Sequence, residues 1–373
     1  MSGTINELTL KLANYLYEKH AQMNTVSFSG YMAYFTLLLL NFGLQGQAKY
    51  DLSAFLDCNY SYIEFSFEKN VFEYECISLL TIDEFYQIGS VRSAIFNSIL
   101  LVESFKQMAI ETYDFEFKSI NPTNIADQYK TITEWTNLLK NAPYKYLFPE
   151  AYGTELEIFI FNELFIKFRW LIPANIRYSG NQIFTDINSM QYQIRMMRMI
   201  DFFGFYNDTD LKASIVFVKL ELNGTYAAIV LPFVDNNIAY VLKNMNDQHF
   251  KTWFEHSEQK KIELHIPHFG IVNKISIKSF LEFYNMNNLF VYNGADFTNM
   301  VGGAGYINDI IQVSAIHINE SGSHMSSPRR EPIMYRKSTK IPSFYVSRPF
   351  IFYLYNSNQN LVLHFSFVKH PNY

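Results

Sequence analysis

The sequence predicts a globular chain that combines helices with many β-strands. Two helical patterns lie near the N-terminus, short runs rich in Val, Ile, Phe and Tyr follow, and a strand hairpin ends the chain. Of the 373 residues 49% are hydrophobic and only 17% are charged, so the chain can bury a large core. Single α+β domains of this length exist, so length alone does not require several domains.

The first helix is predicted over residues 5–19. Apolar side chains recur there at intervals of three and four residues, which places them on one helical face. A second helix is predicted over 32–42, where nearly every side chain is apolar and Gly43 follows as a terminator. Both helices are expected to pack on the core.

Strands are predicted where β-branched and aromatic residues form short runs bounded by polar turns. The predicted strands span 91–102, 156–167, 213–220, 226–232, 262–269, 348–354 and 361–368. A short polar connection joins the last two, so they are expected to form a hairpin.

Composition and charge exclude several functional classes. A net charge of −5 argues against a nucleic-acid-binding protein, which needs clustered Lys and Arg. Two cysteines, Cys58 and Cys76, can form neither a disulfide framework nor a zinc site. His265 and His268, three residues apart on a predicted strand, face opposite sides, so no metal site is predicted. No nucleophile motif accompanies the histidines, which argues against a hydrolytic enzyme.

The sequence contains no signal for membrane insertion or conventional secretion. The longest apolar stretch, 33–40, is shorter than the ~20 residues of a spanning helix. The N-terminus lacks the charged-then-apolar order of a cleaved signal peptide. We therefore expect a protein that is cytoplasmic, or released without a conventional signal peptide, and that does not bind membranes.

The stretch 321–340 differs from the rest of the chain. It is rich in Ser, Pro and Arg, and strand-like segments flank it on both sides. Because so polar a segment cannot pack in a core, we expect a long exposed loop. Loops of this length in compact proteins are commonly functional.

A colinear series of motifs resembles the serpin family. Residues 162–170 read Asn-Glu-Leu-Phe-Ile-Lys-Phe-Arg-Trp and resemble the serpin signature Asn-Ala-x-Tyr-Phe-Lys-Gly-x-Trp, with Phe168 in place of glycine. Further serpin-like landmarks stand in family order at 24–29, 43–47, 194–197, 229–232, 266–269, 295–300 and 348–352. The resemblance covers about residues 6 to 373.

The resemblance implies an α+β serpin fold in a single domain, 1–373, with three β-sheets, about nine helices and an exposed reactive loop at about 323–346. Serpins are not enzymes, and the resemblance implies neither a cofactor nor a metal. A serine protease cleaves the reactive loop, and the N-terminal half of the loop then inserts into the large sheet as a new strand. The expected partner is a serine protease, and the expected state is a monomer.

The resemblance also assigns the residues of the reactive loop. The hinge corresponds to Glu320, Gly322 and Ser323. Counting sixteen residues from Glu320 places the scissile bond between Arg336 and Lys337, which suits a trypsin-like protease. Tyr335 and Lys337 are the alternative recognised residues, and Tyr335 would suit a chymotrypsin-like protease.

The sheet-opening region is assigned to Ser29, Asn162, Trp170 and Gln312. Of the four polar positions that serpins place under the large sheet, Ser29 and Asn162 match, while Met32 and Gln312 replace a serine and a histidine. Gln312 can still donate and accept hydrogen bonds, whereas Met32 cannot replace a hydroxyl. The insertion gap is expected between the strands at 213–220 and 311–320.

The loop departs from the pattern of inhibitory serpins at Pro328, Arg329 and Arg330, where small residues are usual. In an inserted strand Pro328 would remove a ladder donor, and alternation from Ser323 would turn Arg329 inward. Burying that charge unpaired would cost several kcal/mol. Two functions are therefore predicted: a suicide inhibitor of a serine protease and, as the alternative, a non-inhibitory serpin that acts by binding.

Overall fold

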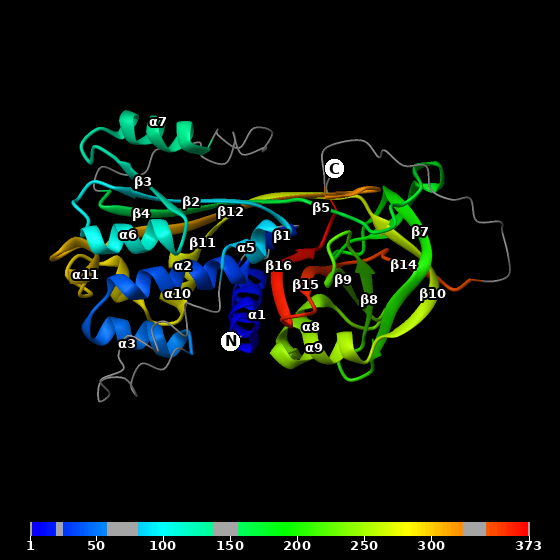
Figure 1. Cartoon of the computed structure of the whole chain (residues 1–373). Coiled ribbons are helices and arrows are strands. Elements are labelled where there is room, and N and C mark those ends of the chain that lie inside the picture. Colours follow the sequence, from blue (N-terminus) through cyan, green and yellow to red (C-terminus); the bar gives the residue numbers. More distant parts are fainter. Residues whose placement is uncertain (1, 20–24, 58–80, 137–155, 324–340, 372–373) are drawn as a thin grey trace.

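The computed structural model describes residues 2–19, 25–57, 81–136, 156–323 and 341–371. Within these ranges the chain forms ten α-helices, two short 3-10 helices and sixteen strands in two hydrogen-bonded sheets. Figure 1 shows one sheet extending across the upper part of the molecule, with helices above and below it, and the other sheet curving through the right-hand part.

The seven-stranded sheet is called the large sheet below. Its strands are β3 (Phe115–Ser119), β2 (Gly89–Asn97), β4 (Ile158–Ile166), β12 (Ile307–Asn319), β13 (Gly322–Ser323) and β5 (Phe168–Arg169), with β11 (Phe269–Ser276) beside β12. All nine residues of β4 are buried, as expected for a strand covered on both faces. Figure 1 shows α7 (Ile125–Thr136) on one face, and α2 (Gly30–Gly43) and α6 (Glu103–Glu111) on the other.

The second sheet has nine strands. They are β1 (Thr25–Phe28), β16 (Leu361–Val368), β15 (Phe350–Asn356), β9 (Thr225–Pro232), β8 (Ala213–Lys219), β7 (Gln191–Asp208), β10 (Glu258–Pro267) and β14 (Ser343–Tyr345), with β6 (Gly180–Thr185) beside β7. The two smaller sheets that the resemblance implies are joined here, because the 18-residue β7 pairs with β6, β10 and β8 in turn.

The remaining helices pack mainly around the core between the sheets. They are α1 (Ser2–Lys19), α3 (Gly46–Phe55), α5 (Asp83–Tyr86), α8 (Ile238–Asn244), α9 (Asp247–Glu255), α10 (Ile277–Phe283), α11 (Thr298–Val301), and the 3-10 helices η3 (Ile176–Tyr178) and η4 (Asn287–Phe290). One cluster of buried apolar side chains joins both sheets with α1 and α2, and a smaller cluster lies between the large sheet and α7. In the described ranges no helix is both long enough and apolar enough to cross a membrane.

Both predicted helices and the terminal hairpin are present as α1, α2, β15 and β16. Two strand predictions were too long. β2 ends at Asn97 because the next residues bond to other segments, as Ser98 does to Glu157. The strand predicted over 262–269 is two strands, since Pro267 ends β10 and Phe269 begins β11.

The predicted insertion gap was wrong on one side. Residues 213–220 form β8, which lies in the second sheet between β7 and β9. In the large sheet the partner of β12 is β4, and the two strands are parallel over eight register pairs. β4 and β8 are both mainly apolar, so their composition does not reveal which sheet each joins.

Candidate functional site

The hinge predicted at 320–323 begins a new strand in the large sheet. After β12 ends at Asn319, the chain reverses and returns as β13. Gly322 lies opposite Asn319 on one side and Arg169 on the other, and Ser323 lies opposite Ile318 and Phe168. β13 is antiparallel to both neighbours, so these two residues already fill the end of the seam between β12 and the strand β4–β5.

Gly322 is required by both backbone conformation and space. Its φ of 129° is one that L side chains rarely adopt, and a Cβ there would lie 2.3 Å from the carbonyl oxygen of Phe168. Ser323 is buried and its Oγ donates to the carbonyl oxygen of Ile166 at 2.7 Å. A small hydroxyl side chain therefore fits this position, and a larger one would displace the strand ends.

Trp170 holds the end of β12. Its Nε1 donates to the Asn319 carbonyl at 2.9 Å, and its backbone N–H donates to the Ser321 carbonyl at 3.1 Å. Phe168, which stands where the serpin signature has glycine, packs edge-on against the Trp170 ring at 5.0 Å. The substitution therefore adds apolar contact under the hinge.

Glu320 anchors the hinge electrostatically. Its Oε1 lies 3.1 Å from Arg195 Nη2 on β7 and 3.1 Å from His268 Nε2 in the turn between β10 and β11. Burial opposes ionisation of this carboxyl, but the hydrogen bond from His268 and a backbone N–H outweigh it and lower the pKa of Glu320 to about 2. The sequence analysis considered His268 only as a possible metal ligand and did not single out Arg195.

Three of the four sheet-opening residues, Ser29, Asn162 and Gln312, lie together on the α2 face of the large sheet, while Trp170 lies at the hinge. Ser29 caps α2, accepting from the Met32 N–H at 3.1 Å, and its Oγ donates to the Leu363 carbonyl at 2.6 Å. The Gln312 carboxamide accepts from the Ser29 N–H at 2.7 Å and donates to the Ser29 carbonyl at 3.1 Å. This bidentate contact ties β12 to the start of α2 through one N–H and the carbonyl oxygen of the Gln312 amide.

Asn162 lies opposite Gln312 across the parallel seam. It donates to Ser93 Oγ at 2.9 Å and accepts from Thr36 Oγ1 at 2.9 Å. Thr36 was missed by the sequence analysis, although it lies one helical turn after Met32. Its hydroxyl reaches the seam from α2, while Met32 is fully buried.

A second polar group, also missed, lies deeper on the same face. Ser27 Oγ is 2.8 Å from Ser314 Oγ on β12 and 3.1 Å from His364 Nε2 on β16. Asn273 forms two hydrogen bonds with the Ser27 backbone, each at 2.9 Å. Burial lowers the pKa of His364 to about 3, so the His364 imidazole is neutral at physiological pH. Side-chain hydrogen bonds therefore tie β12 to residues 27–29 at Ser314 as well as at Gln312.

Glu163 lies on the opposite face of β4, under α7. It stands where the serpin signature has alanine, is completely buried, and neither carboxylate oxygen has a hydrogen-bond partner within the described ranges. The nearest cation in register, Arg92 on β2, instead donates to Glu116 and to the Trp135 carbonyl. Burial raises the pKa of Glu163 to about 8. The sequence signal was the departure from alanine.

The residues assigned to the scissile bond, Tyr335, Arg336 and Lys337, lie outside the described residues, as do Pro328, Arg329 and Arg330. The chain is described again from Ile341, and β14 then pairs with β10 in the second sheet. The loop therefore connects a strand of the large sheet to a strand of the other sheet. Within the described ranges no three His, Cys, Asp or Glu side chains are grouped to hold a metal ion.

Comparison with known proteins gives a consistent result. The family Serpin (serine protease inhibitor) matches residues 3–371. Intracellular coagulation inhibitor 2 of Tachypleus tridentatus is 21% identical over 77% of this chain and 70% of its own length. Serpin B13 of Homo sapiens is 22% identical over 72% of this chain and 68% of its own length.

Two solved structures share the fold. Human thyroxine-binding globulin in complex with thyroxine superposes with a TM-score of 0.87 at 17% identity, covering 100% of this chain and 98% of that one. Native protease nexin-1 with heparin superposes with a TM-score of 0.83 at 16% identity, covering 99% and 98%. The α+β serpin fold predicted from the motifs is confirmed, and the chain belongs to the serpin family.

Proposed function

We propose that this chain is a suicide inhibitor of a trypsin-like serine protease, with the Arg336–Lys337 bond as its bait. The observation that carries the proposal is the seating of Gly322 and Ser323 as the first two residues of an antiparallel strand between β12 and β5. Cleavage of the loop would free the chain beyond Ser323 to continue along the same path.

The strand geometry favours such insertion. β4 and β12 form one parallel ladder of eight register pairs. A strand continuing from Ser323 would run antiparallel to both, so one parallel ladder would be replaced by two antiparallel ladders. Antiparallel pairing is slightly more stable per residue, and the number of ladder hydrogen bonds would about double. Neither gain requires a catalytic residue.

The register also identifies neighbours for the two arginines that depart from the family pattern. Six residues beyond Ser323, Arg329 would lie between Gln312 and Asn162, because these residues lie six positions before Ile318 and Phe168. Two carboxamide oxygens there can accept from a guanidinium. Burial of Arg329 would therefore occur among polar groups, at a lower cost than burial among apolar ones.

Arg330 would point to the other face, beneath α7. By the same register Pro328 lies beside Glu163, so Arg330 lies one diagonal position away from that carboxyl. Diagonal neighbours on one face of a sheet are within reach of long side chains. We propose that Glu163 supplies the counter-charge for Arg330 in the inserted state.

Mixing the protein with trypsin tests the proposal. We expect a covalent complex that survives SDS, and loss of this complex in Arg336→Ala. Lys340→Ala, which removes another cation of the same loop, should still form it. Cleavage of the loop without any complex would contradict inhibition.

That outcome would favour a second candidate, a non-inhibitory serpin that acts by binding. Pro328, Met32 and the two arginines motivate this candidate, since each departs from the inhibitory pattern. The solved structure of thyroxine-binding globulin, which has the same fold, contains a bound small molecule. A cleaved protein that neither traps trypsin nor gains stability would support this candidate.

The proposal includes a monomer that acts in the cytoplasm or after release without a conventional signal peptide. One relative is named an intracellular inhibitor. Sedimentation of the purified protein and fractionation of expressing cells test these two points, and a dimer or a luminal location would contradict them.

A further inference from the structure

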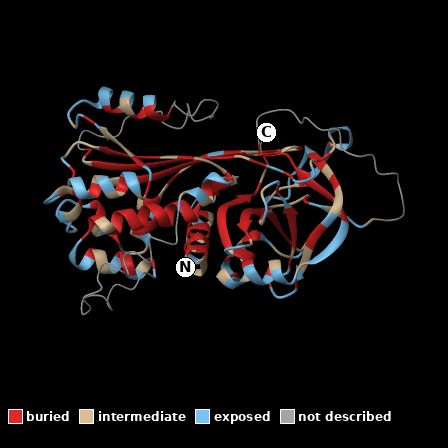
Figure 2. Cartoon of the chain, in the orientation of Figure 1, coloured by how far each residue is buried: buried red, intermediate tan, exposed pale blue. Residues whose placement is uncertain are grey.

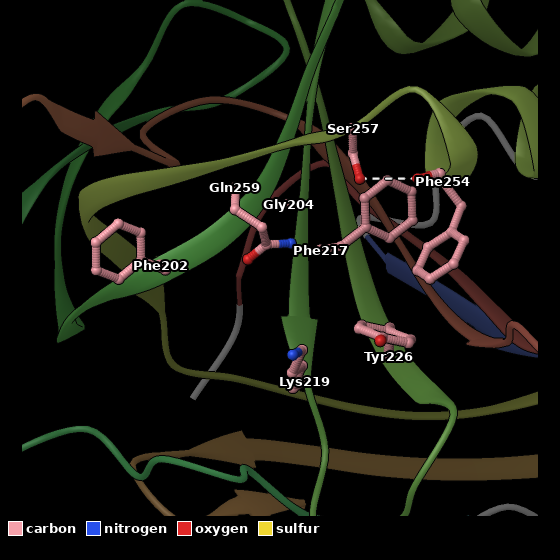
Figure 3. Close-up of a pocket in the computed structure, with 8 residues that line it drawn as sticks. All are labelled: Phe202, Gly204, Phe217, Lys219, Tyr226, Phe254, Ser257 and Gln259. Carbon is pink, nitrogen blue, oxygen red and sulfur yellow. Dashed lines mark hydrogen bonds between the residues drawn. The ribbon is translucent and has the colours of Figure 1, made fainter.

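A cavity of about 160 Å³ opens on one face of the second sheet. None of its lining residues belongs to the hinge or to the sheet-opening layer. Figure 3 shows aromatic rings on both sides of the hollow, with the side chains of Lys219 and Gln259 reaching toward it.

A glycine in the middle of the sheet creates the hollow. Gly204 on β7 lies in register between Phe217 on β8 and Gln259 on β10, and residues opposite one another share a face. A Cβ at Gly204 would lie 2.9 Å from Ser257 Oγ and 3.4 Å from the Phe217 Cβ. Because glycine has no side chain there, the floor of the cavity stays open.

Aromatic rings form the wall on one side. The Phe254 ring of α9 packs edge-on against Phe217 at 5.3 Å and against Tyr226 at 4.8 Å, so the three rings support one another. The volume is close to the ~150 Å³ of a cavity that accepts benzene. A single planar ring therefore matches both the size and the surface of the hollow.

The rim carries a positive charge. Lys219, opposite Tyr226 in register, is exposed, and its ammonium group has no ion-pair or hydrogen-bond partner in the described part of the chain. The Gln259 carboxamide is likewise without a hydrogen bond there, and no carboxylate lines the cavity. These groups favour an anion at the rim over a cation or a neutral molecule.

We propose that this cavity binds a small aromatic carboxylate. The ring lies against Phe217, Tyr226 and Phe254, and the carboxylate accepts from Lys219 and Gln259. This site is independent of the reactive loop, so it does not rest on inhibition of a protease.

Sodium phenylacetate is the probe, with toluene and sodium acetate as matched ligands that lack the charge and the ring. Isothermal titration and ligand-observed NMR on the full chain should show saturable binding of phenylacetate in about the millimolar range. Toluene should bind more weakly, and acetate should not saturate.

Substitutions at Lys219 and at Gly204 test the charged rim and the open floor of the cavity separately. Lys219→Gln should weaken phenylacetate about fivefold and leave toluene unchanged, while Lys243→Gln, an exposed lysine on α8, should change neither. Gly204→Val should abolish binding of both aromatic ligands. Gly204→Ala fills less of the floor, displaces only the Ser257 hydroxyl, and should weaken both if the larger variant does not fold.

The proposal is overturned if phenylacetate does not saturate the wild-type protein. It is also overturned if phenylacetate binds folded Gly204→Ala as tightly as wild type, or if Lys219→Gln weakens toluene as much as phenylacetate.

Discussion

Asn162 and Glu163 are neighbours on β4, yet they lie in opposite environments. Asn162 faces α2, where it bonds to Ser93 and Thr36. Glu163 faces α7 and the apolar layer there, with neither oxygen bonded within the described ranges. One face of the seam is thus held by satisfied polar contacts, while the other carries an unsatisfied acid. β4 is therefore stabilised on one face and destabilised on the other.

The largest expected effect comes from breaking the satisfied face. Gln312→Met keeps much of the side-chain volume but leaves the buried Ser29 N–H without its acceptor, and the Ser29 carbonyl loses one of its two donors and keeps the Ala33 N–H. We expect a loss of about 4 kcal/mol in the free energy of unfolding, measured by urea denaturation. Gln107→Met, at an exposed position of α6, is the matched control. Equal, small losses in both variants would show that the Gln312 contact is not stabilising.

The unsatisfied face should respond in the opposite direction. The folded-state pKa of Glu163 is about 8 against an ordinary 4.5, so the folded protein binds the proton more tightly and stability falls as pH rises through this window. The side chain introduced by Glu163→Gln cannot ionise. At pH 8, the upper end of the window, we expect this variant to be more stable than wild type by on the order of 3 kcal/mol. The stabilities of the variant and the wild type should converge as the pH falls to 4.5.

Melting temperatures measured across this pH window test the expectation. Glu134→Gln, an exposed position on α7, controls for charge removal and should follow wild type. Parallel profiles for Glu163→Gln and wild type would contradict a buried, protonated Glu163.

The hinge end of the same sheet should show the reverse pH dependence. The pKa of Glu320 is lowered from 4.5 to about 2, so its stabilising contribution is fully present above 4.5 and is lost as pH falls toward 2. Because Arg195 is partly exposed, we expect Glu320→Gln to cost only about 1 kcal/mol at neutral pH. Faster hydrogen exchange of the Ser323 amide is the readout. Unchanged exchange would mean that Gly322 and Trp170 hold the hinge without Glu320.

The smallest effect is the proposed coupling across the seam. A double-mutant cycle of Glu163→Gln and Arg330→Gln should give a coupling of about 1 kcal/mol in the loop-cleaved protein and none in the intact one. Zero coupling in both forms would contradict the proposed pairing of Arg330 with Glu163.

The sequence predicted the elements of this fold better than their pairing. Helix α1 and the hairpin β15–β16 follow from local periodicity. The placement of 213–220 beside the seam failed because apolar runs of two sheets look alike, and strand partners are set by distant residues. Gln312 and Asn162 were found through the family motifs. Thr36 and His268 were missed because their contacts come from separate elements that only the fold brings together.

We propose that the chain beyond Ser323 inserts between β4 and β12 after cleavage of the loop. The most direct test of this insertion is the melting temperature before and after the loop is cleaved at Arg336–Lys337. Insertion would replace one parallel ladder with two antiparallel ladders and bury Arg329 and Arg330 beside polar partners, and we expect the melting temperature to rise by more than about 10 °C. An unchanged melting temperature in fully cleaved protein would contradict insertion.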